Sequence, residues 1–373
     1  MTKRILLAWE GGAGRGHVVT LRVMAEALGP QHHYEAALCR MDHAAELSAV
    51  CGEVYPSAGL YLHAAPRKAL GWPRTASWAD FLGDLVFAFP ERLKVQFDWW
   101  IEVLRSRRID LVIADFAPIS MLAARALGIP SVCVGTGYSA PPPGMKSFPI
   151  LLPEYTTLVH DEAALLANAN ATLAPFNLEP LGAFSDIYRA SVSMPRTIRQ
   201  LDPYDGLRTS PLLPPLNEAL PRSAGAGDEI FVYFSTAETA YAPLFEALCG
   251  LRLPVRAYLP GADPQLLDRL RQAGVMVEVA PLPVEQIAAR SRLMLNAGQH
   301  GSLCMGLGLG IPQLTLPQHL EHLYHARRAF DLGVAEIVPY RSWDAGQIIA
   351  VTRKMYFDPD RTARSQALAE SPY

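Results

Sequence analysis

Residues 296–333 read NAGQHGSLCMGLGLGIPQLTLPQHLEHLYHARRAFDLG, and this stretch is the most informative part of the chain. A short apolar run, 293–295, has the composition of a buried strand, and a loop of small residues from Ala297 to Ser302 then opens a helical segment. The start of such a helix exposes unpaired backbone N–H groups and the positive end of the helix dipole, which suits a diphosphate. The same pattern also fits a tight strand-to-helix turn that binds no ligand.

The elements around this stretch alternate between strand and helix. Apolar runs predict strands over 230–234, 255–259, 275–279, 293–295 and 313–316. Helical spacing of apolar residues predicts helices over 241–248, 264–273, 285–289 and 320–332. This repeated order is the one that a doubly wound parallel sheet requires.

The N-terminal half shows the same alternation. A strand is expected over 5–9, a loop with four glycines over 10–16, a helix over 18–28 and a second strand over 34–39. Further along, strands are expected over 110–114 and 131–134, with a helix over 119–127 between them. The aromatic stretch 72–100 between these parts is interpreted mainly as core.

A proline-rich segment divides the two halves. It contains Pro211, Pro214, Pro215 and Pro221, followed by Gly225 and Gly227. We therefore predict an α/β protein with an N-terminal Rossmann-like domain over 1–215 and a C-terminal domain over 216–345. Residues 346–373 are expected to form a helix that packs back on the N-terminal domain. Two such sheets that face each other would leave a cleft at their strand ends, where ligands bind in this class of fold.

Composition narrows the possible functions. The 373 residues are 50% hydrophobic and 18% charged, enough apolar material for two cores, and the net charge of −3 argues against nucleic acid as a partner. The five cysteines show no metal-ligand or redox spacing, and no metal site is predicted. Because no apolar run reaches membrane length, we expect no transmembrane segment and a cytoplasmic protein.

Four motifs of the quoted stretch carry a family resemblance. Gly310-Ile311-Pro312-Gln313 is followed by Leu316-Pro317-Gln318, and then by the pairs Glu321-His322 and His325-Ala326. In order and spacing, over nearly 40 residues without a gap, these resemble the donor-site signature of UDP-glycosyltransferase-like GT-B enzymes, especially the bacterial macrolide and antibiotic glycosyltransferases.

The resemblance implies a GT-B fold of two facing Rossmann-like domains. It also implies an inverting, metal-independent glycosyltransferase, hexosyltransferase-like, that moves a sugar from a nucleotide-diphosphate donor to a hydroxyl of a small, possibly hydrophobic acceptor. The co-substrate would be a UDP or dTDP sugar, and no further cofactor is expected. The donor-binding positions carried over by the motifs, or suggested beside them, are Ser235, Thr236, Leu282, Gly298, His300, Gly301, Ser302, Gln318, Glu321 and His322.

The sequence departs from the family pattern at the donor site. The phosphate-binding histidine of the family falls on Ala297, the second glycine of its His-Gly-Gly falls on Gln299, and its ribose-binding glutamate falls on Met305. Pro281 replaces the tryptophan that stacks on the nucleotide base. These changes leave the sugar and the base of the donor open, and His300 is a candidate for the missing phosphate contact. Glu321 and His322 could also be no more than a polar helix start.

A base is needed to remove the proton of the acceptor hydroxyl, and histidine suits this role near neutral pH. Gly16-His17-Val18 follows the first strand and resembles the Gly-His-Val-x-Pro pattern that carries the family base, although Thr20 replaces the proline. Ala114-Asp115-Phe116 resembles the context of the aspartate that orients this base. We therefore predict a catalytic pair of His17 and Asp115. The alternatives are that each residue caps the helix that follows it.

Two other functions compete with glycosyl transfer. The departures at Ala297 and Pro281 would also fit a GT-B-like protein that binds a nucleotide or sugar nucleotide without transferring it and acts as a partner or regulator. The loop glycines Gly12, Gly14 and Gly16 suggest a dinucleotide oxidoreductase, but their spacing is not G-x-G-x-x-G.

Overall fold

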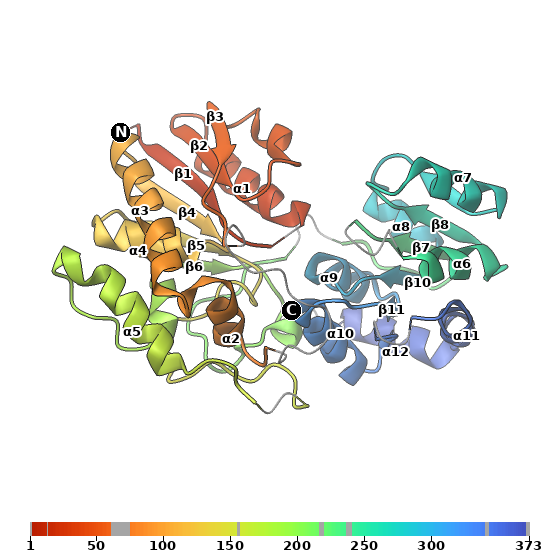
Figure 1. Cartoon of the computed structure of the whole chain (residues 1–373). Coiled ribbons are helices and arrows are strands. Elements are labelled where there is room, and N and C mark those ends of the chain that lie inside the picture. Colours follow the sequence, from red (N-terminus) through yellow and green to blue (C-terminus); the bar gives the residue numbers. More distant parts are fainter. Residues whose placement is uncertain are drawn as a thin grey trace. The chain divides into compact units, whose positions relative to one another are not determined.

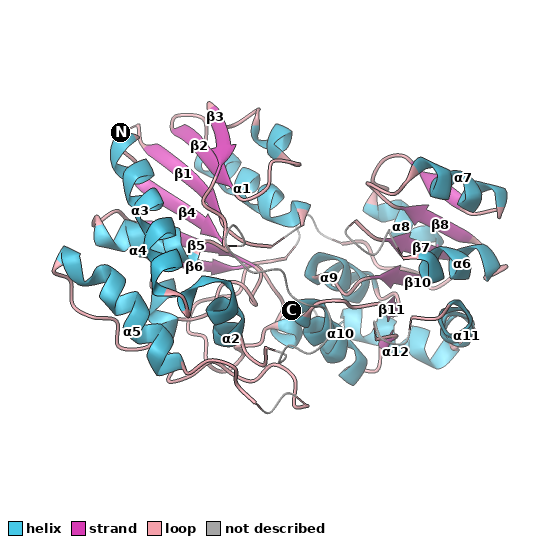
Figure 2. Cartoon of the chain, viewed as in Figure 1, coloured by secondary structure: helices cyan, strands magenta, loops and turns pink. Residues whose placement is uncertain are grey.

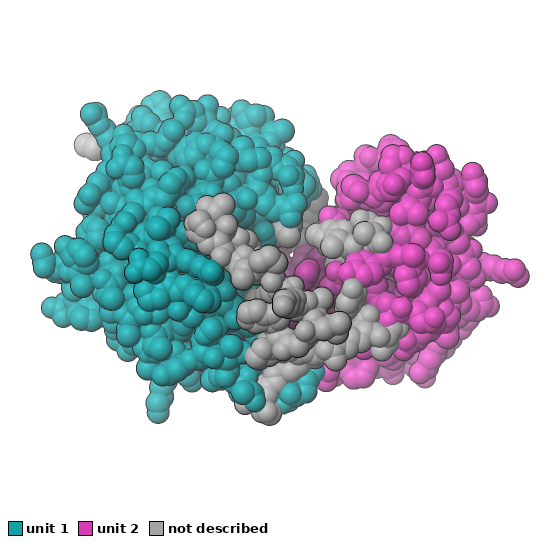
Figure 3. All heavy atoms as spheres, in the orientation of Figure 1, with its two compact units in different colours: residues 1–197, 202–213 teal, residues 198–201, 214–373 magenta. Residues whose placement is uncertain are grey.

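The computed structural model describes residues 2–12, 14–60, 75–154, 157–215, 220–235, 241–339 and 343–370. The chain divides into two compact units, one of residues 1–197 and 202–213 and one of residues 198–201 and 214–373 (Figure 3). Thr236, one of the predicted donor residues, lies outside the described residues. The main break between the units, after Leu213, falls in the proline-rich segment where the sequence predicted a linker.

The first unit is built on a sheet of six parallel strands, as the alternating sequence pattern predicted (Figure 1). In chain order the strands are β1 (Arg4–Trp9), β2 (His33–Leu38), β3 (Glu53–Pro56), β4 (Leu111–Asp115), β5 (Ser131–Gly135) and β6 (Val192–Pro195). Their order in the sheet is β3-β2-β1-β4-β5-β6. The chain thus winds outward in both directions from the β1–β4 pair, and that pair is the switch point where ligands bind in such sheets.

Helices flank this sheet (Figure 2). The α-helices are α1 (Arg15–Leu28), α2 (Trp78–Leu82), α3 (Pro90–Ser106), α4 (Pro118–Ala126) and α5 (Glu162–Leu173); a π-helical turn spans Gly83–Phe87, and short 3₁₀ helices span Ala44–Leu47, Ala174–Phe176 and Phe184–Tyr188. β1 lies in the middle of the sheet, between β2 and β4, and its apolar residues 5–9 are buried, as expected for a central parallel strand with helices on both faces of its sheet. In the aromatic stretch, Trp78 and Trp100 are core residues as expected, while Trp72 lies outside the described residues.

The second unit repeats the same topology. Its strands are β7 (Glu229–Tyr233), β8 (Val255–Tyr258), β9 (Met276–Glu278), β10 (Ser291–Asn296), β11 (Gln313–Thr315) and β12 (Ala335–Ile337), all parallel and in the order β12-β11-β10-β7-β8-β9. Its helices are α6 (Ala242–Gly250), α7 (Pro264–Gln272), α8 (Val284–Arg290), α9 (His300–Leu309), α10 (Leu320–Asp331), α11 (Ala345–Tyr356) and α12 (Pro359–Glu370), with a 3₁₀ turn at Arg199–Leu201. The switch point here is the β7–β10 pair.

The C-terminal segment differs from the single returning helix that we expected. Residues 346–370 form most of α11 and all of α12, and both helices are counted in the second unit. The physical reason is the core of that unit: Ile348 and Met355 of α11 are buried in its main apolar cluster, and Leu368 of α12 packs on the cluster of Leu303 and Leu307. These helices therefore complete the second hydrophobic core.

Three strands escaped the sequence analysis, namely β3, β6 and β12. Each lies at the edge of its sheet and is only partly buried. An edge strand needs no continuous apolar run, so the periodicity that identifies central strands is weak there.

Candidate functional site

A first candidate site lies at the switch point of the first sheet. His17 stands at the third position of α1, which follows β1, and Asp115 is the last residue of β4. The Nδ1 atom of His17 lies 2.9 Å from Oδ1 of Asp115. Because Asp115 is buried and can only accept in its ionised form, the bond assigns the proton to Nδ1 and makes Nε2 the basic nitrogen. The structure therefore brings together the two residues that we predicted as a pair.

Aromatic rings fix the plane of the imidazole. Trp9 stacks on His17 with ring centroids 5.1 Å apart, and Phe116 lies at 6.2 Å. Phe116 in turn packs on the buried ring of Trp78, with centroids 4.8 Å apart. The imidazole side chain keeps 18% of its surface exposed, so the pair is oriented by the protein and remains accessible.

Glycine at position 12 is required by the position of the imidazole. Its φ is +95°, a region that favours glycine, and a Cβ atom there would meet Nε2 of His17 at 2.5 Å. The glycine loop thus leaves room for the basic nitrogen. The sequence analysis noted this glycine only as part of a cluster and did not identify its role.

The capping alternatives for these two residues find no support. His17 lies inside α1, whose N-cap residue Gly14 carries no side chain. The N–H groups of Ile119 and Ser120 at the start of α4 are bonded to the carboxyl group of Glu10, whereas Asp115 is bonded to His17. Glu10 is a buried residue of the site region that the sequence analysis missed. A charged residue directly after an apolar strand was the available signal.

A second candidate site follows β10 in the second unit. The loop 297–299 leads into α9, and no side chain caps the N-terminus of that helix. Gly298 has a φ of +84°, and a Cβ there would come within 2.8 Å of the carbonyl oxygen of His322 at the start of α10. The loop therefore packs tightly on α10, which brings the predicted positions 298 and 322 together.

Side chains bond the loop amides in this structure. Asn296, fully buried, accepts from the N–H of Gly298 at 2.8 Å and donates to Gln313. Gln299 accepts from the N–H of Ala297 at 3.0 Å through Oε1. Ala297 stands at the family position of the phosphate-binding histidine, and its backbone N–H is thus bonded to the side-chain carboxamide of Gln299.

Several polar atoms in this region are buried without a hydrogen-bond partner. They are Nε2 of Gln299, Nε2 of Gln318 and Nδ1 of His322. Burial together with the neighbouring His319 lowers the pKa of His322 to about 3. Buried polar atoms are normally bonded, so these three indicate capacity for a polar ligand. Two of the residues, Gln318 and His322, are predicted donor contacts.

The side chain of His300 is buried against other side chains of the second unit. Its ring is buried between Cys304, at 3.5 Å from Nε2 to Sγ, and His325, with ring centroids 5.0 Å apart. Burial and the neighbouring imidazoles hold the pKa of His325 well below its usual range. The imidazole of His300 thus belongs to a packed cluster of side chains between α9 and α10.

The remaining predicted donor residues lie at four places in the second unit. Gly301 is exposed in the first turn of α9 and Ser302 is buried beside it. Ser235 follows β7 at the switch point of the second sheet, Glu321 is half-buried in the first turn of α10, and the side chain of Leu282 packs on the apolar cluster of Ile287 and Ile311.

Within the described ranges, no cluster of three or more His, Cys, Asp or Glu side chains suited to a metal occurs. The sequence holds one Asp-x-Asp triplet, Asp358-Pro359-Asp360, at the start of α12. Asp358 accepts from the backbone N–H of Arg361 at 2.9 Å, so its carboxylate serves the helix start. Among the described helices, none is both long and apolar enough to cross a membrane.

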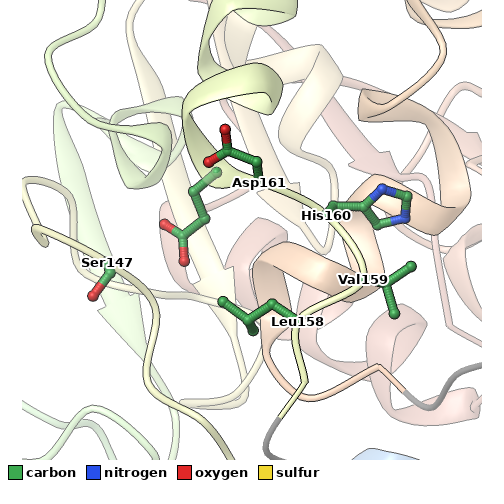
Figure 4. A pocket seen from close by; sticks show the side chains of 6 residues that line it. Ser147, Leu158, Val159, His160 and Asp161 are labelled. Atoms are coloured by element: carbon green, nitrogen blue, oxygen red, sulfur yellow. The ribbon is translucent and has the colours of Figure 1, made fainter.

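The first unit also contains a pocket of about 360 Å³. It is lined by Ser147, Leu158, Val159, His160, Asp161 and Glu162 (Figure 4). Figure 4 shows the imidazole of His160 and the carboxylate of Asp161 pointing in different directions from this segment. His160 is bonded to Asp84 at 2.9 Å. The pocket shares no residue with the pair of His17 and Asp115.

Taken together, these features define a protein of two Rossmann-like units, one with a histidine–aspartate pair at its switch point and one with a polar loop at the corresponding place. Scans of the sequence against protein-family models and against curated proteins gave no match. Solved structures do match the fold.

Three of these structures represent the matches. The calicheamicin glycosyltransferase is 17% identical, with a TM-score of 0.70, and the match covers 99% of this chain and 94% of that chain. The glycosyltransferase SnogD from Streptomyces nogalater is 20% identical, with a TM-score of 0.58 and coverage of 99% and 95%. The spinosyn rhamnosyltransferase SpnG complexed with thymidine diphosphate is 15% identical, with a TM-score of 0.61 and coverage of 98% and 95%. The chain therefore has the GT-B fold, as its sequence motifs predicted.

Proposed function

We propose that this protein is an inverting, metal-independent glycosyltransferase that moves a sugar from a nucleoside-diphosphate donor to a hydroxyl of a small acceptor. The observation that carries the proposal is the bond between Nδ1 of His17 and Oδ1 of Asp115 at the switch point of the first sheet. The likeness to solved antibiotic glycosyltransferases, among them two rhamnosyltransferase structures and three complexes with thymidine diphosphate, supports it.

The chemistry assigned to the pair is general base catalysis. Nε2 of His17 takes the proton of the acceptor hydroxyl while its oxygen forms a bond to the anomeric carbon of the sugar. The bond from that carbon to the diphosphate oxygen breaks on the opposite side, and the diphosphate leaves with the electron pair. Asp115 keeps the proton on Nδ1 and stabilises the imidazolium that forms.

The second unit would hold the donor. The uncapped N-terminus of α9 offers backbone N–H groups and a positive dipole end to the diphosphate, which is the charge stabilisation that a metal supplies elsewhere. The buried, unpartnered atoms of Gln318 and His322 would bond the rest of the donor. We propose a UDP or dTDP sugar as the co-substrate, with no further cofactor. The mechanism requires this donor to reach the imidazole of His17.

One observation favours a second candidate function. The side chain of Gln299 accepts a hydrogen bond from the backbone N–H of Ala297. In the family that the sequence resembles, the position of Ala297 carries the phosphate-binding histidine. A GT-B-like protein that binds a nucleotide or sugar nucleotide and transfers nothing would also accept this arrangement. Calorimetry with UDP and dTDP, combined with turnover of a panel of sugar nucleotides, separates the two: binding without turnover of any donor supports the second function.

The test of the proposed role is His17→Ala. Transfer, followed by mass spectrometry of products from a panel of sugar nucleotides and aglycones, should fall to background, while the Kd for the nucleoside diphosphate stays within about twofold. His160→Ala is a matched control, because His160 is also bonded to an aspartate at 2.9 Å and its side chain is equally exposed, at 18%. Full transfer by the His17 variant would refute the assignment.

A further inference from the structure

The carboxyl group of Glu10 is fully buried and lies directly after β1. One of its oxygens accepts from the N–H of Ile119 at 3.0 Å, and the other accepts from the N–H of Ser120. These are the second and third residues of α4, whose N-cap residue, Ala117, has no side chain able to bond them. Glu10 therefore caps a helix that begins 108 residues further along the chain.

The main chain of Glu10 bonds the same turn from its other end. Its N–H donates to the carbonyl oxygen of Phe116 at 3.2 Å. Phe116 has a φ of +46°, a conformation that a non-glycine residue keeps only where its surroundings hold it. Glu10 thus spans the turn of Phe116 and Ala117, and this turn starts immediately after Asp115.

Burial raises the pKa of Glu10 to about 8, while the two N–H groups of α4 oppose this rise. A buried ionisable group is unfavourable compared with an apolar side chain of the same size. Its presence between the two loops of the site is therefore explained best by what it holds in place.

We propose that Glu10 is a positioning residue for the pair of His17 and Asp115. By fixing the start of α4 and the Phe116 turn, it sets the Asp115 carboxylate against Nδ1 of His17. The two N–H groups of α4 bond one carboxyl oxygen each, and the ionised form, in which both oxygens are full acceptors, predominates above the pKa of about 8. The consequence for transfer rests on the proposed function, whereas the consequence for the imidazole does not.

Glu10→Gln tests this inference, because it keeps the shape and replaces one acceptor by an NH₂ group that faces an N–H donor. We expect kcat for sugar transfer to fall about 10- to 100-fold, as for a small misplacement of a catalytic group, and the donor KM to stay within about twofold. The ¹⁵N chemical shifts of the His17 ring, recorded on the protein without substrate, should show a smaller Nδ1-protonated fraction than in the native protein.

Glu10→Asp is the second variant, in case the glutamine variant does not fold. It keeps both acceptors but shortens the reach by one methylene, and it should show the same changes to a smaller degree. Leu165→Ala in α5 controls for general loosening, because Leu165 is a core residue of the same unit and lies outside the loops that follow β1 and β4. At equal loss of Tm it should leave the ring shifts unchanged.

Two results would overturn the inference. One is a folded Glu10 variant whose His17 ring shifts and kcat equal those of the native protein. The other is a Leu165 variant whose ring shifts change in the same way as those of the Glu10 variants. The NMR measurement needs no turnover. If the native protein transfers no sugar and the Glu10 variants still change the imidazole, the positioning role stands and the proposed function fails.

Discussion

Replacing Gly12 by alanine should inactivate the site through a single methyl group. The new Cβ would lie 2.5 Å from Nε2 of His17 and 3.2 Å from two ring carbons, whereas ordinary contacts begin at 3.4 Å. The ring must therefore move by about 1 Å, and it cannot do so while Nδ1 keeps its 2.9 Å bond to Asp115. The substitution thus displaces the proposed base from its partner.

Two effects of this change have separate magnitudes. The φ of +95° should cost an alanine about 1–2 kcal/mol of stability, which lowers Tm by about 2–4 °C per kcal/mol in a unit of this size. Displacing the imidazole by about 1 Å should lower kcat about 100-fold, equivalent to about 2.7 kcal/mol of activation free energy.

Gly128→Ala separates the two effects. Gly128 belongs to the same unit, has a φ of +66°, and a Cβ there would meet no atom within 4 Å. Both variants should lose similar thermal stability, and only the Gly12 variant should lose rate in a single-turnover assay at saturating donor. Rates of the two variants within about threefold of each other would refute the reasoning.

Three further predictions concern other parts of the molecule. Gln299→Gly removes the side chain that occupies the amide of Ala297, so calorimetry should show about fivefold tighter binding of a nucleoside diphosphate; weaker binding would contradict this. The pKa of His322 is lowered to about 3 in the folded protein. Below pH 6.5 the imidazole therefore becomes protonated in the unfolded protein, whereas in the folded protein it stays neutral down to about pH 3. Urea unfolding of the second unit should therefore show stability falling by up to about 1.4 kcal/mol per pH unit between these values, with a flatter profile in His322→Gln; an unchanged profile would be contrary. Asp202→Ala should lower the free energy of unfolding of the first unit, measured in urea, by about 3–5 kcal/mol, because the buried guanidinium of Arg208 loses the carboxylate that balances its charge. Replacing both residues by apolar ones should recover much of this loss.

The central part of each sheet could be predicted from sequence, because buried parallel strands need continuous apolar runs. The run 5–9 and the run 293–295 both satisfy this and both form central strands. The destination of residues 346–370 could not be predicted, because the apolar positions of Ile348 and Met355 specify burial but not the core that buries them.

The site was predictable to the extent that topology determines it. His17 follows β1 and Asp115 ends β4, and parallel neighbours at a switch point place such residues side by side. The capping role of Glu10 could not be predicted, because a charged residue after an apolar strand marks a candidate position but does not identify its partner, a helix more than a hundred residues away. Nor could the sequence show that His300 packs against Cys304 and His325.

The departures at the donor loop have a physical consequence that differs from loss of function. In this structure the loop amides of Ala297 and Gly298 are bonded by the side chains of Gln299 and Asn296, whereas the side chain of the N-cap residue Gln299 makes no capping hydrogen bond to α9. A diphosphate would then rest mainly on the helix start, and it would gain loop contacts only by displacing Gln299. Since the pair of His17 and Asp115 is formed independently of this loop, the change should raise the donor KM and leave kcat largely unaffected. A low kcat at saturating donor, with tight donor binding, would instead favour the nucleotide-binding alternative.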